Sequence, residues 1–299
     1  MRIDSIMTFF IEVLVGGLLA GVMYTMVALG FVLIYKASGV FNFAQGSLVL
    51  FAALTFVTLS EHGFSLVSAL GASLAVMVIV AIAIERIALR SLVGAPPTSL
   101  FLATLGLSFV IEGLAQLMYG TQVHGLELGI SDSPIRGLPI EVSRFDLFAA
   151  GVAAGLIAVL GVLFRTTRAG VSLRAVADDP LAAIAVGLDL RRLWALAWAG
   201  SGIVALVAGL LWGGRVGVQF SLSLVVLKAL PVLIIGGFSS IGGVIAGGLI
   251  VGASEKVAEL YLGPLLGGGL ESWFPYFLAV GFLLARPTGL FGERLVERA

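Results

Sequence analysis

Cysteine is absent from this 299-residue sequence, and histidine is nearly so, with only two residues. Without cysteine the chain can form neither a disulfide framework nor a thiolate metal site. Its two histidines, His62 and His124, stand in different connections, so we expect no paired-histidine metal site. Charge is scarce too: Asp, Glu, Lys and Arg make up 11% of the chain, whereas a soluble globular domain carries about 25%. Such a chain cannot cover a large water-facing surface.

Signatures of the common enzyme and nucleic-acid-binding classes are also missing. The 17 basic and 17 acidic residues give no net charge, whereas a nucleic-acid-binding protein would carry a basic stripe. No Walker-type phosphate loop occurs. The stretch Gly237–Gly243 is not the nucleophile elbow of a hydrolase, because Ile241 stands where the second glycine belongs. We therefore predict no catalytic residues and no cofactor, and any ATP that drives this protein would be hydrolysed by another chain.

Apolar residues, by contrast, are abundant: they make up 60% of the chain, and the mean hydropathy is +1.14. A membrane-spanning helix needs about 20 apolar residues, and these runs are too long and continuous for the strands of a barrel. Nine stretches qualify or nearly do: 9–35, 43–60, 64–84, 98–118, 147–164, 193–213, 222–238, 241–262 and 273–285. The sequence predicts an all-α, polytopic integral membrane protein with eight to ten transmembrane or discontinuous helices, in a single domain of residues 1–299.

The distribution of basic residues predicts the orientation of these segments, because Lys and Arg collect in cytoplasmic loops. Basic residues gather in three connections: Arg86 and Arg90; Arg165, Arg168, Arg174, Arg191 and Arg192; and Arg286, Arg294 and Arg298. We place these connections in the cytoplasm and the more acidic 119–146 connection outside. The first apolar run is longer than a signal peptide's, so we expect it to be retained. Three crossings before Arg86 would put the N-terminus outside, unless one early segment does not cross, and the sequence leaves both arrangements open.

Polar residues within apolar segments are candidates for contact with a transported solute, because burying them unpaired is costly. Asn42 and Gln45 lie in a polar, glycine-containing interruption at 36–46, and a break at membrane depth is tolerated when it is buried or lines a cavity. Their amides could bind a solute or hold the break together. Lys228 is alone in an apolar run; it could face the pathway, pair with a carboxylate or reach the outer interface. We see no intramembrane chain of Asp, Glu or His of the kind that a proton relay needs.

Glycine pairs spaced four residues apart recur in the apolar segments. The pairs are Gly17/Gly21, Gly209/Gly213, Gly243/Gly247 and Gly248/Gly252. In lipid such pairs let helix backbones approach one another closely. We interpret them as architecture.

The connection 165–192 contains a short amphipathic element. Asp179 is suited to the N-cap of a helix and Pro180 to its first turn. Residues 181–186 continue as a short helix of small and apolar residues, and Gly187 can end it in the left-handed conformation. Such an apolar surface outside the bilayer fits either a cytoplasmic docking partner or a position on the lipid surface.

The stretch Gly170–Gly187 resembles the cytoplasmic loop of branched-chain amino acid ABC permeases, more closely that of the first of the two permeases such systems usually contain. It keeps the Ala-Ala-x-x-x-Gly part (Ala182, Ala183, Gly187) of the loop by which many ABC permeases engage their ATPases, although Leu181 replaces the usual Glu. Three further stretches support the resemblance in the same order along the chain: Asn42–Gly46 after Gly39; Lys228–Leu230 with Gly236–Gly243; and Pro287–Gly292.

This resemblance implies a bacterial inner-membrane permease subunit that works with a second, homologous permease, two cytoplasmic ATP-binding subunits and an external solute-binding protein. Asp179, Ala182, Ala183 and Gly187 would couple it to the ATPases, and Asn42, Gln45 and Lys228 would lie on the pathway. Branched-chain or other hydrophobic amino acids are the implied solutes. Urea, amides and small organic acids fit the same family, and a self-sufficient secondary transporter or channel is the rival interpretation. A membrane enzyme is a more distant alternative.

Overall fold

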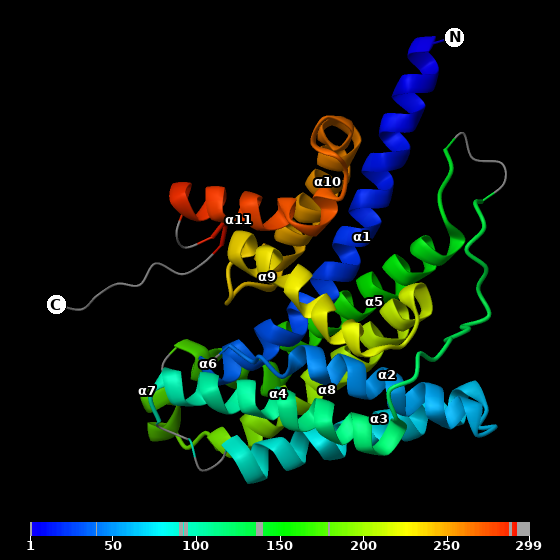
Figure 1. Cartoon of the computed structure of the whole chain (residues 1–299). Helices are drawn as coiled ribbons and strands as arrows, with labels where there is room; N and C mark the ends of the chain where they lie inside the picture. Colours follow the sequence, from blue (N-terminus) through cyan, green and yellow to red (C-terminus); the bar gives the residue numbers. More distant parts are fainter. Residues whose placement is uncertain are drawn as a thin grey trace. The chain divides into compact units, whose positions relative to one another are not determined.

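The computed structural model describes residues 2–39, 41–89, 92, 95–135, 140–178, 180–286 and 289–291, although not the side chains of residues 2–6, 89, 97, 178, 180 and 181. Within these residues the chain is helical, and its only β pairing is in isolated bridges. The helices are α1 (Arg2–Ser38), α2 (Gln45–Glu61), α3 (Leu66–Ile84), η1 (Glu85–Leu89), α4 (Pro97–Tyr119), α5 (Arg144–Thr166), α6 (Arg168–Asp178), α7 (Pro180–Ala185), α8 (Leu190–Val216), η3 (Phe220–Leu224), α9 (Val225–Gly236), α10 (Ile241–Leu266), η4 (Leu270–Ser272) and α11 (Phe274–Ala285) (Figure 1).

Six of these helices are long and apolar enough to cross a membrane. They are formed by α1, α3 with its continuation into η1, α4, α5, α8 and α10, and three shorter apolar helices occupy 45–61, 220–236 and 274–285. Each of the nine predicted stretches corresponds to one of these helices. The prediction of an all-α polytopic membrane protein is therefore confirmed.

The chain forms two compact units, which are described separately. The first unit contains Met1–Ala28, Gly129–Leu156 and Leu227–Ala299, and the second contains Leu29–Leu128 and Ile157–Val226. Because the boundaries at 28/29 and 156/157 fall inside α1 and α5, each of these helices contributes to both units.

Helix α2 forms the core of the second unit. Every residue from Gln45 to Val57 is buried, and α3, α4, α8 and η3 pack around it. The approach of α8 is close: a Cβ on Gly209 would lie 2.5 Å from the Val49 carbonyl oxygen. A helix that is apolar on all sides is stable only when it is surrounded, so the composition of α2 accounts for its central place.

Helices α1 and α10 cross through glycine in the first unit. A Cβ on Gly17 would lie 2.6 Å from the Gly252 carbonyl oxygen, and one on Gly21 would collide with Gly248. Residue numbers rise along α1 as they fall along α10, so the two helices run antiparallel. Two of the predicted small-residue pairs, 17/21 and 248/252, thus meet each other, as expected for close packing in lipid.

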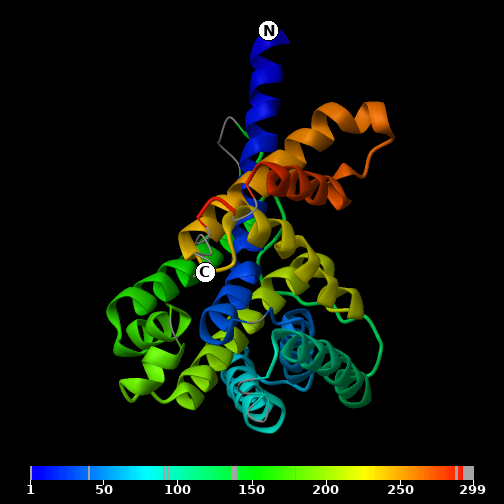
Figure 2. The ribbon, with the colours of Figure 1, turned by 90° about the vertical axis from the view of Figure 1, so that its left-hand side faces the viewer.

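A second face of α10 packs closely against α9. A Cβ on Gly247 would lie 2.5 Å from the Val232 carbonyl oxygen, and Gly236 and Gly243 contact each other backbone to backbone. Helix α10 then turns back through residues 267–273 and packs against α11 (Figure 2). The pair 243/247 therefore also serves close helix packing.

Three connections meet in the second unit, and one of them belongs to the 119–146 connection that the sequence places outside the membrane. His124 and Val218 exchange two backbone hydrogen bonds of 3.0 and 2.9 Å, and His124 Nδ1 lies 2.8 Å from Glu61 Oε1. The segments 61–64, 120–128 and 217–221 must therefore lie on one side of the membrane, which agrees with the distribution of arginine.

The direction of α1 indicates on which side of the membrane the N-terminus lies, a question that the sequence left open. The orientation derived from the basic residues makes α10 run outward, and α1 is antiparallel to α10. We therefore expect the N-terminus outside.

Single cysteines can test this orientation because the chain contains none of its own. We predict that cysteines at Ser5 and Ser133 react with a membrane-impermeant thiol reagent added outside. Cysteines at Thr167 and Glu297 should react only when the reagent reaches the cytoplasmic face. Labelling of the Ser133 variant from the cytoplasmic side alone would contradict the whole orientation.

The α1–α10 crossing can be tested with two neighbouring glycines. A Cβ on Gly16 would meet nothing within 4 Å, whereas one on Gly17 would press on the backbone of α10. We predict that Gly17→Val lowers the yield and melting temperature of the detergent-solubilised protein, since forced overpacking costs about 1–3 kcal/mol. Gly16→Val is the matched control and should leave both unchanged; equal effects of the two changes would contradict the close crossing.

Candidate functional site

The predicted interruption lies between α1, which ends at Ser38, and α2, which begins at Gln45. Gly39 has a positive φ of 68°, a backbone conformation that favours glycine. The Asn42 side chain then closes a local turn by accepting a hydrogen bond from the Ala44 N–H at 3.1 Å. Thr104 of α4 supports the same segment, since its hydroxyl accepts from the Phe43 N–H at 3.2 Å. The break is thus held by polar contacts that replace the lost helical ones.

Gln45 joins the break to two other helices. Its Oε1 accepts from the Ser201 hydroxyl of α8 at 2.5 Å, and that hydroxyl also lies 3.2 Å from the Gly30 carbonyl oxygen of α1. Gly30 leaves room for this arrangement, because a Cβ at that position would overlap the Gln45 amide and displace it. The Nε2 of Gln45 is buried without a hydrogen-bond partner among the described residues.

Both candidate amides are fully buried within the second unit. The Asn42 side chain bonds its near neighbours in the chain, since it accepts from the Ala44 N–H at 3.1 Å and donates to Gln45 Oε1 at 3.5 Å, which favours a structural role for that side chain. Gln45 combines a structural bond through Oε1 with an unused donor at Nε2. An unused buried donor is costly, so Nε2 is the atom of this pair best suited to a passing solute.

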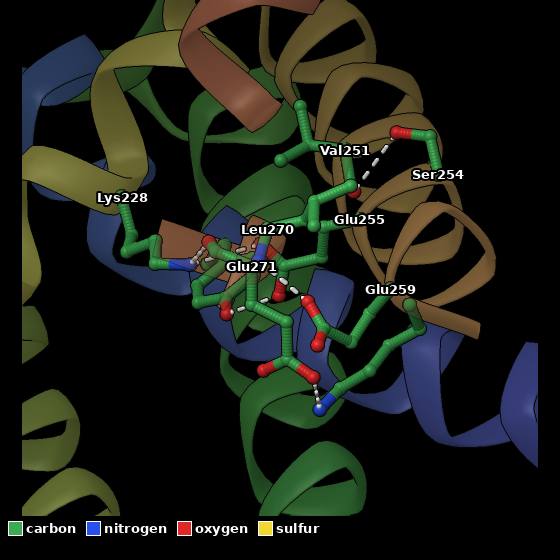
Figure 3. Close-up of polar contacts among 9 residues, drawn as sticks. Lys228, Val251, Ser254, Glu255, Glu259, Leu270 and Glu271 are labelled. Atoms are coloured by element: carbon green, nitrogen blue, oxygen red, sulfur yellow. Dashed lines mark hydrogen bonds and ion pairs between the residues drawn. The ribbon is translucent and has the colours of Figure 1, made fainter. Parts of the chain in front are cut away.

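Lys228 lies in a charged cluster of the first unit (Figure 3). Its Nζ donates to Glu255 Oε2 of α10 at 3.0 Å and to the backbone carbonyl oxygen of Glu271. Tyr24 of α1 completes the group, since its hydroxyl donates to Glu255 Oε1 at 2.6 Å and Lys228 Nζ lies 5.6 Å from the centre of its ring. The Glu255 side chain is fully buried, whereas the Lys228 side chain is 24% exposed. Of the three alternatives for Lys228, pairing with a carboxylate is the one observed.

The turn between α10 and α11 is tied to the same helix. The Glu259 carboxylate accepts from three successive backbone N–H groups, those of Gly269, Leu270 and Glu271, at 3.0, 2.6 and 3.2 Å. Lys256 forms a 2.6 Å ion pair with the Glu271 side chain. Helix α10 therefore carries successive charged groups that hold this turn beside the Lys228–Glu255 pair (Figure 3).

Sequence reasoning missed this cluster. Neither Glu255 nor Glu259 was named from the sequence, although both stand within the predicted segment 241–262 and Glu255 is fully buried. A signal was available: a carboxylate inside an apolar segment needs a partner, and Lys228 is the lone cation of the neighbouring segment. Nothing in the sequence pointed to Tyr24, which is 231 residues from Glu255.

The connection 165–192 contains two helices, α6 and α7, where the sequence predicted one. Helix α7 begins at Pro180, as predicted, and the predicted cap Asp179 lies outside the described residues. Gly187 ends the element as predicted, with a φ of 86°. The Gly187 N–H donates to Ile184 and the Leu188 N–H to Ala183, at 2.9 and 3.0 Å, which is the bonding pattern of a glycine-terminated helix.

The residues of α7 and the turn after it differ in their exposure to solvent. Ala183 is buried, whereas Ala182 and Gly187 are exposed. Ile184 and Val186 are 52% and 77% exposed, respectively. These apolar side chains form a small surface suited to a docking partner.

A pocket of about 420 Å³ opens in the second unit where the connections predicted to be external meet. It is lined by Phe56, Val57, Ser60, Glu61, Phe64, Leu66, Gly125, Leu126 and Glu127. The lining combines apolar side chains with two carboxylates, so its chemistry suits a group with an apolar stem and a positive charge.

The similarity to known proteins extends over nearly the whole length of the chain. A protein-family model described as "Branched-chain amino acid transport system / permease component" matches residues 13–286. The high-affinity branched-chain amino acid transport system permease protein BraD of Pseudomonas aeruginosa is 26% identical, with 97% of this chain and 98% of that protein covered. LivH of Escherichia coli K12, which carries the same description, is also 26% identical over 97% and 98%.

An archaeal relative and a solved structure extend these comparisons. The probable branched-chain amino acid transport permease protein LivH of Methanocaldococcus jannaschii is 29% identical, over 94% of this chain and 92% of that protein. Among solved structures, PsaBC from Streptococcus pneumoniae in complex with Fab matches with a TM-score of 0.48 at 15% identity, over 90% of this chain and 89% of that chain. That structural similarity is too low to support an inference about fold or function.

Proposed function

The chain belongs to the branched-chain amino acid transport system permease family, and on that premise we propose that it imports branched-chain or other hydrophobic amino acids. It is a permease subunit of an ABC importer and a multi-pass inner-membrane protein. The observation that carries the solute class is the near full-length similarity to permeases described as acting on branched-chain amino acids. Other small polar solutes, such as urea, amides and short organic acids, are the second candidate within the family.

The proposal includes the partners that such a system needs. A second, similar permease completes the pathway, two cytoplasmic subunits bind and hydrolyse ATP, and an external solute-binding protein delivers the solute. The pocket near Glu61 and Glu127 supports docking on the external side, because carboxylates beside apolar side chains can take up a basic side chain. Residues 1–299 act together as one permease domain.

In this proposal the α7 region couples the permease to the ATPases. The exposed apolar residues Ile184 and Val186 provide a contact surface, and the Gly187 turn gives the short helix a defined end. Asp179, Ala182 and Ala183 belong to the same element. Movement of the ATP-binding subunits would shift this element and thereby change access to the pathway.

Uptake by the reconstituted transporter tests both the solute and the coupling. With the second permease, the ATP-binding subunits and the binding protein in proteoliposomes, the wild type should import L-leucine in an ATP-dependent manner and not urea or acetamide. Ala183→Arg places charge and bulk at a buried position, and Gly187→Val forces a branched residue to a positive φ. We predict that both variants insert but lose transport-linked ATP hydrolysis.

The membrane-inserted fraction of each variant serves as the control for this experiment. Normal uptake by both variants would remove α7 from the ATPase interface while leaving the solute assignment intact. Import of urea or acetamide in place of leucine would instead overturn the solute assignment.

We also propose that Asn42, Gln45 and Lys228 border the solute pathway. Amides offer donors and acceptors without a fixed charge, so they can bind the polar ends of a solute without trapping it. Replacing Asn42 or Gln45 with Leu should lower uptake, and Gln45→Leu is the more direct test because it removes the unused Nε2 donor. Loss of one hydrogen bond costs about 1 kcal/mol, or roughly fivefold in rate.

A matched variant separates solute contact from structure at this position. Ser201→Ala removes the structural hydrogen bond to Gln45 Oε1 and leaves Nε2 in place. If Gln45→Leu assembles and transports at the wild-type rate, the amide is a packing residue. If Ser201→Ala and Gln45→Leu lower uptake only together with the melting temperature, the role of Gln45 is structural.

A further inference from the structure

The Lys228–Glu255 pair is an unusual feature for apolar helices. Taking two charges out of water is costly, and well-packed apolar side chains are often at least as stable as a buried ion pair. Charged residues inside membrane segments therefore mark functional positions by default. The close α1–α10 and α9–α10 contacts through glycine already hold these helices together, so packing alone does not require the pair.

The pair has one accessible side and one enclosed side. Glu255 is fully buried and receives a hydrogen bond from Tyr24 at 2.6 Å, whereas Lys228 is partly exposed. The geometry therefore presents an ammonium group toward the outside of the unit, with a carboxylate directly behind it at 3.0 Å.

We propose that this pair is the binding site for the charged ends of a zwitterionic amino acid, an inference that rests on the proposed amino acid import. The α-carboxylate of the solute binds the Lys228 ammonium, and its α-ammonium group binds the Glu255 carboxylate. One ion pair within the protein is thereby exchanged for two ion pairs with the solute. No bond is made or broken and no proton moves, and every charge keeps a partner of opposite sign.

This exchange explains why the site consists of one cation and one anion. A solute with only a carboxylate would leave Glu255 without a cation, and a solute with only an amine would leave Lys228 without an anion. An unpaired buried charge is strongly unfavourable. The pair therefore favours zwitterions over singly charged solutes of the same shape.

One feature near the pair allows it to open. Pro231 lies inside α9, three residues after Lys228, and has no N–H to bond the Leu227 carbonyl, which weakens the first turn of that helix. The α9 backbone that carries Lys228 therefore has fewer constraints than a regular helix, whereas the turn that contains Glu271 stays fixed by Glu259 and Lys256.

The experiment uses the complete transporter in proteoliposomes with saturating solute-binding protein and radiolabelled L-leucine. The double variant Lys228→Met/Glu255→Gln removes both charges and keeps the side-chain sizes and an acceptor for Tyr24. We expect it to assemble with a wild-type melting temperature and to lose at least tenfold in leucine uptake. The matched control is Lys256→Met, which removes the cation next to Glu255 on α10, where it forms a 2.6 Å ion pair with the Glu271 side chain, and this variant should transport within twofold of the wild type.

A single variant provides a readout that a structural role would not produce. Glu255→Gln leaves Lys228 charged but removes the group that takes the α-ammonium. We expect 4-methylpentanoate, which is leucine without its amino group, to inhibit this variant at least tenfold more strongly than the wild type. This result remains decisive if the double variant fails to assemble.

The outcomes separate this site from the proposed function. If the wild type imports leucine and the assembled double variant does so within twofold, the pair is structural and the site is overturned alone. Equal inhibition of wild type and Glu255→Gln by 4-methylpentanoate overturns it as well. If the wild type imports no zwitterionic amino acid but does import urea or acetamide, the proposed solute class and this site both fall.

Discussion

A hydrocarbon environment offers no hydrogen-bond partners, so each polar group within it must be satisfied by the protein itself. This constraint accounts for the contacts made at two places where the chain is not a regular apolar helix: the break before α2 and the charged part of α10. Between α1 and α2 the regular helix is interrupted, and Asn42 within the break, Thr104 of α4 and Ser201 of α8 supply side-chain hydrogen bonds there. On α10 the charged residues Glu255, Lys256 and Glu259 each have a partner of opposite charge or a set of backbone N–H groups.

The two units meet this constraint in different ways. In the second unit the polar contacts around the break are made by neutral amides, hydroxyls and backbone groups. They lie at the start of the buried helix α2. In the first unit they are made by full charges around Lys228 and Glu255. Neutral groups stabilise an irregular backbone without a large cost of desolvation, whereas paired charges are costly to bury and are exchanged more readily for other charges. This difference agrees with the two proposed roles, in which the amides at the break offer uncharged contacts and the charged pair exchanges partners with the ends of a solute.

Much of this architecture could be predicted from the sequence, because helix formation in lipid depends on local runs of apolar residues. The nine segments, the break before Gln45, and the end of α7 at Gly187 all rest on signals a few residues long. Helix α6 was missed because it is too polar to register as a membrane segment. The partnership of Lys228, Glu255 and Tyr24 was missed because it depends on which helices become neighbours, and neighbours distant in sequence leave no periodic pattern.

The glycine contacts between α1 and α10 fix the axial position of one helix against the other. Side chains lean toward the N-terminus of their own helix, and because these helices are antiparallel, Tyr24 and Glu255 lean toward each other. One turn of helix is about 5.4 Å long, roughly twice the 2.6 Å that separates the Tyr24 hydroxyl from the Glu255 carboxylate. A slip by a single turn would therefore part them. Glycines within one turn of Tyr24 and of Glu255 therefore set the alignment of these two side chains, because they fix how far one helix lies along the other.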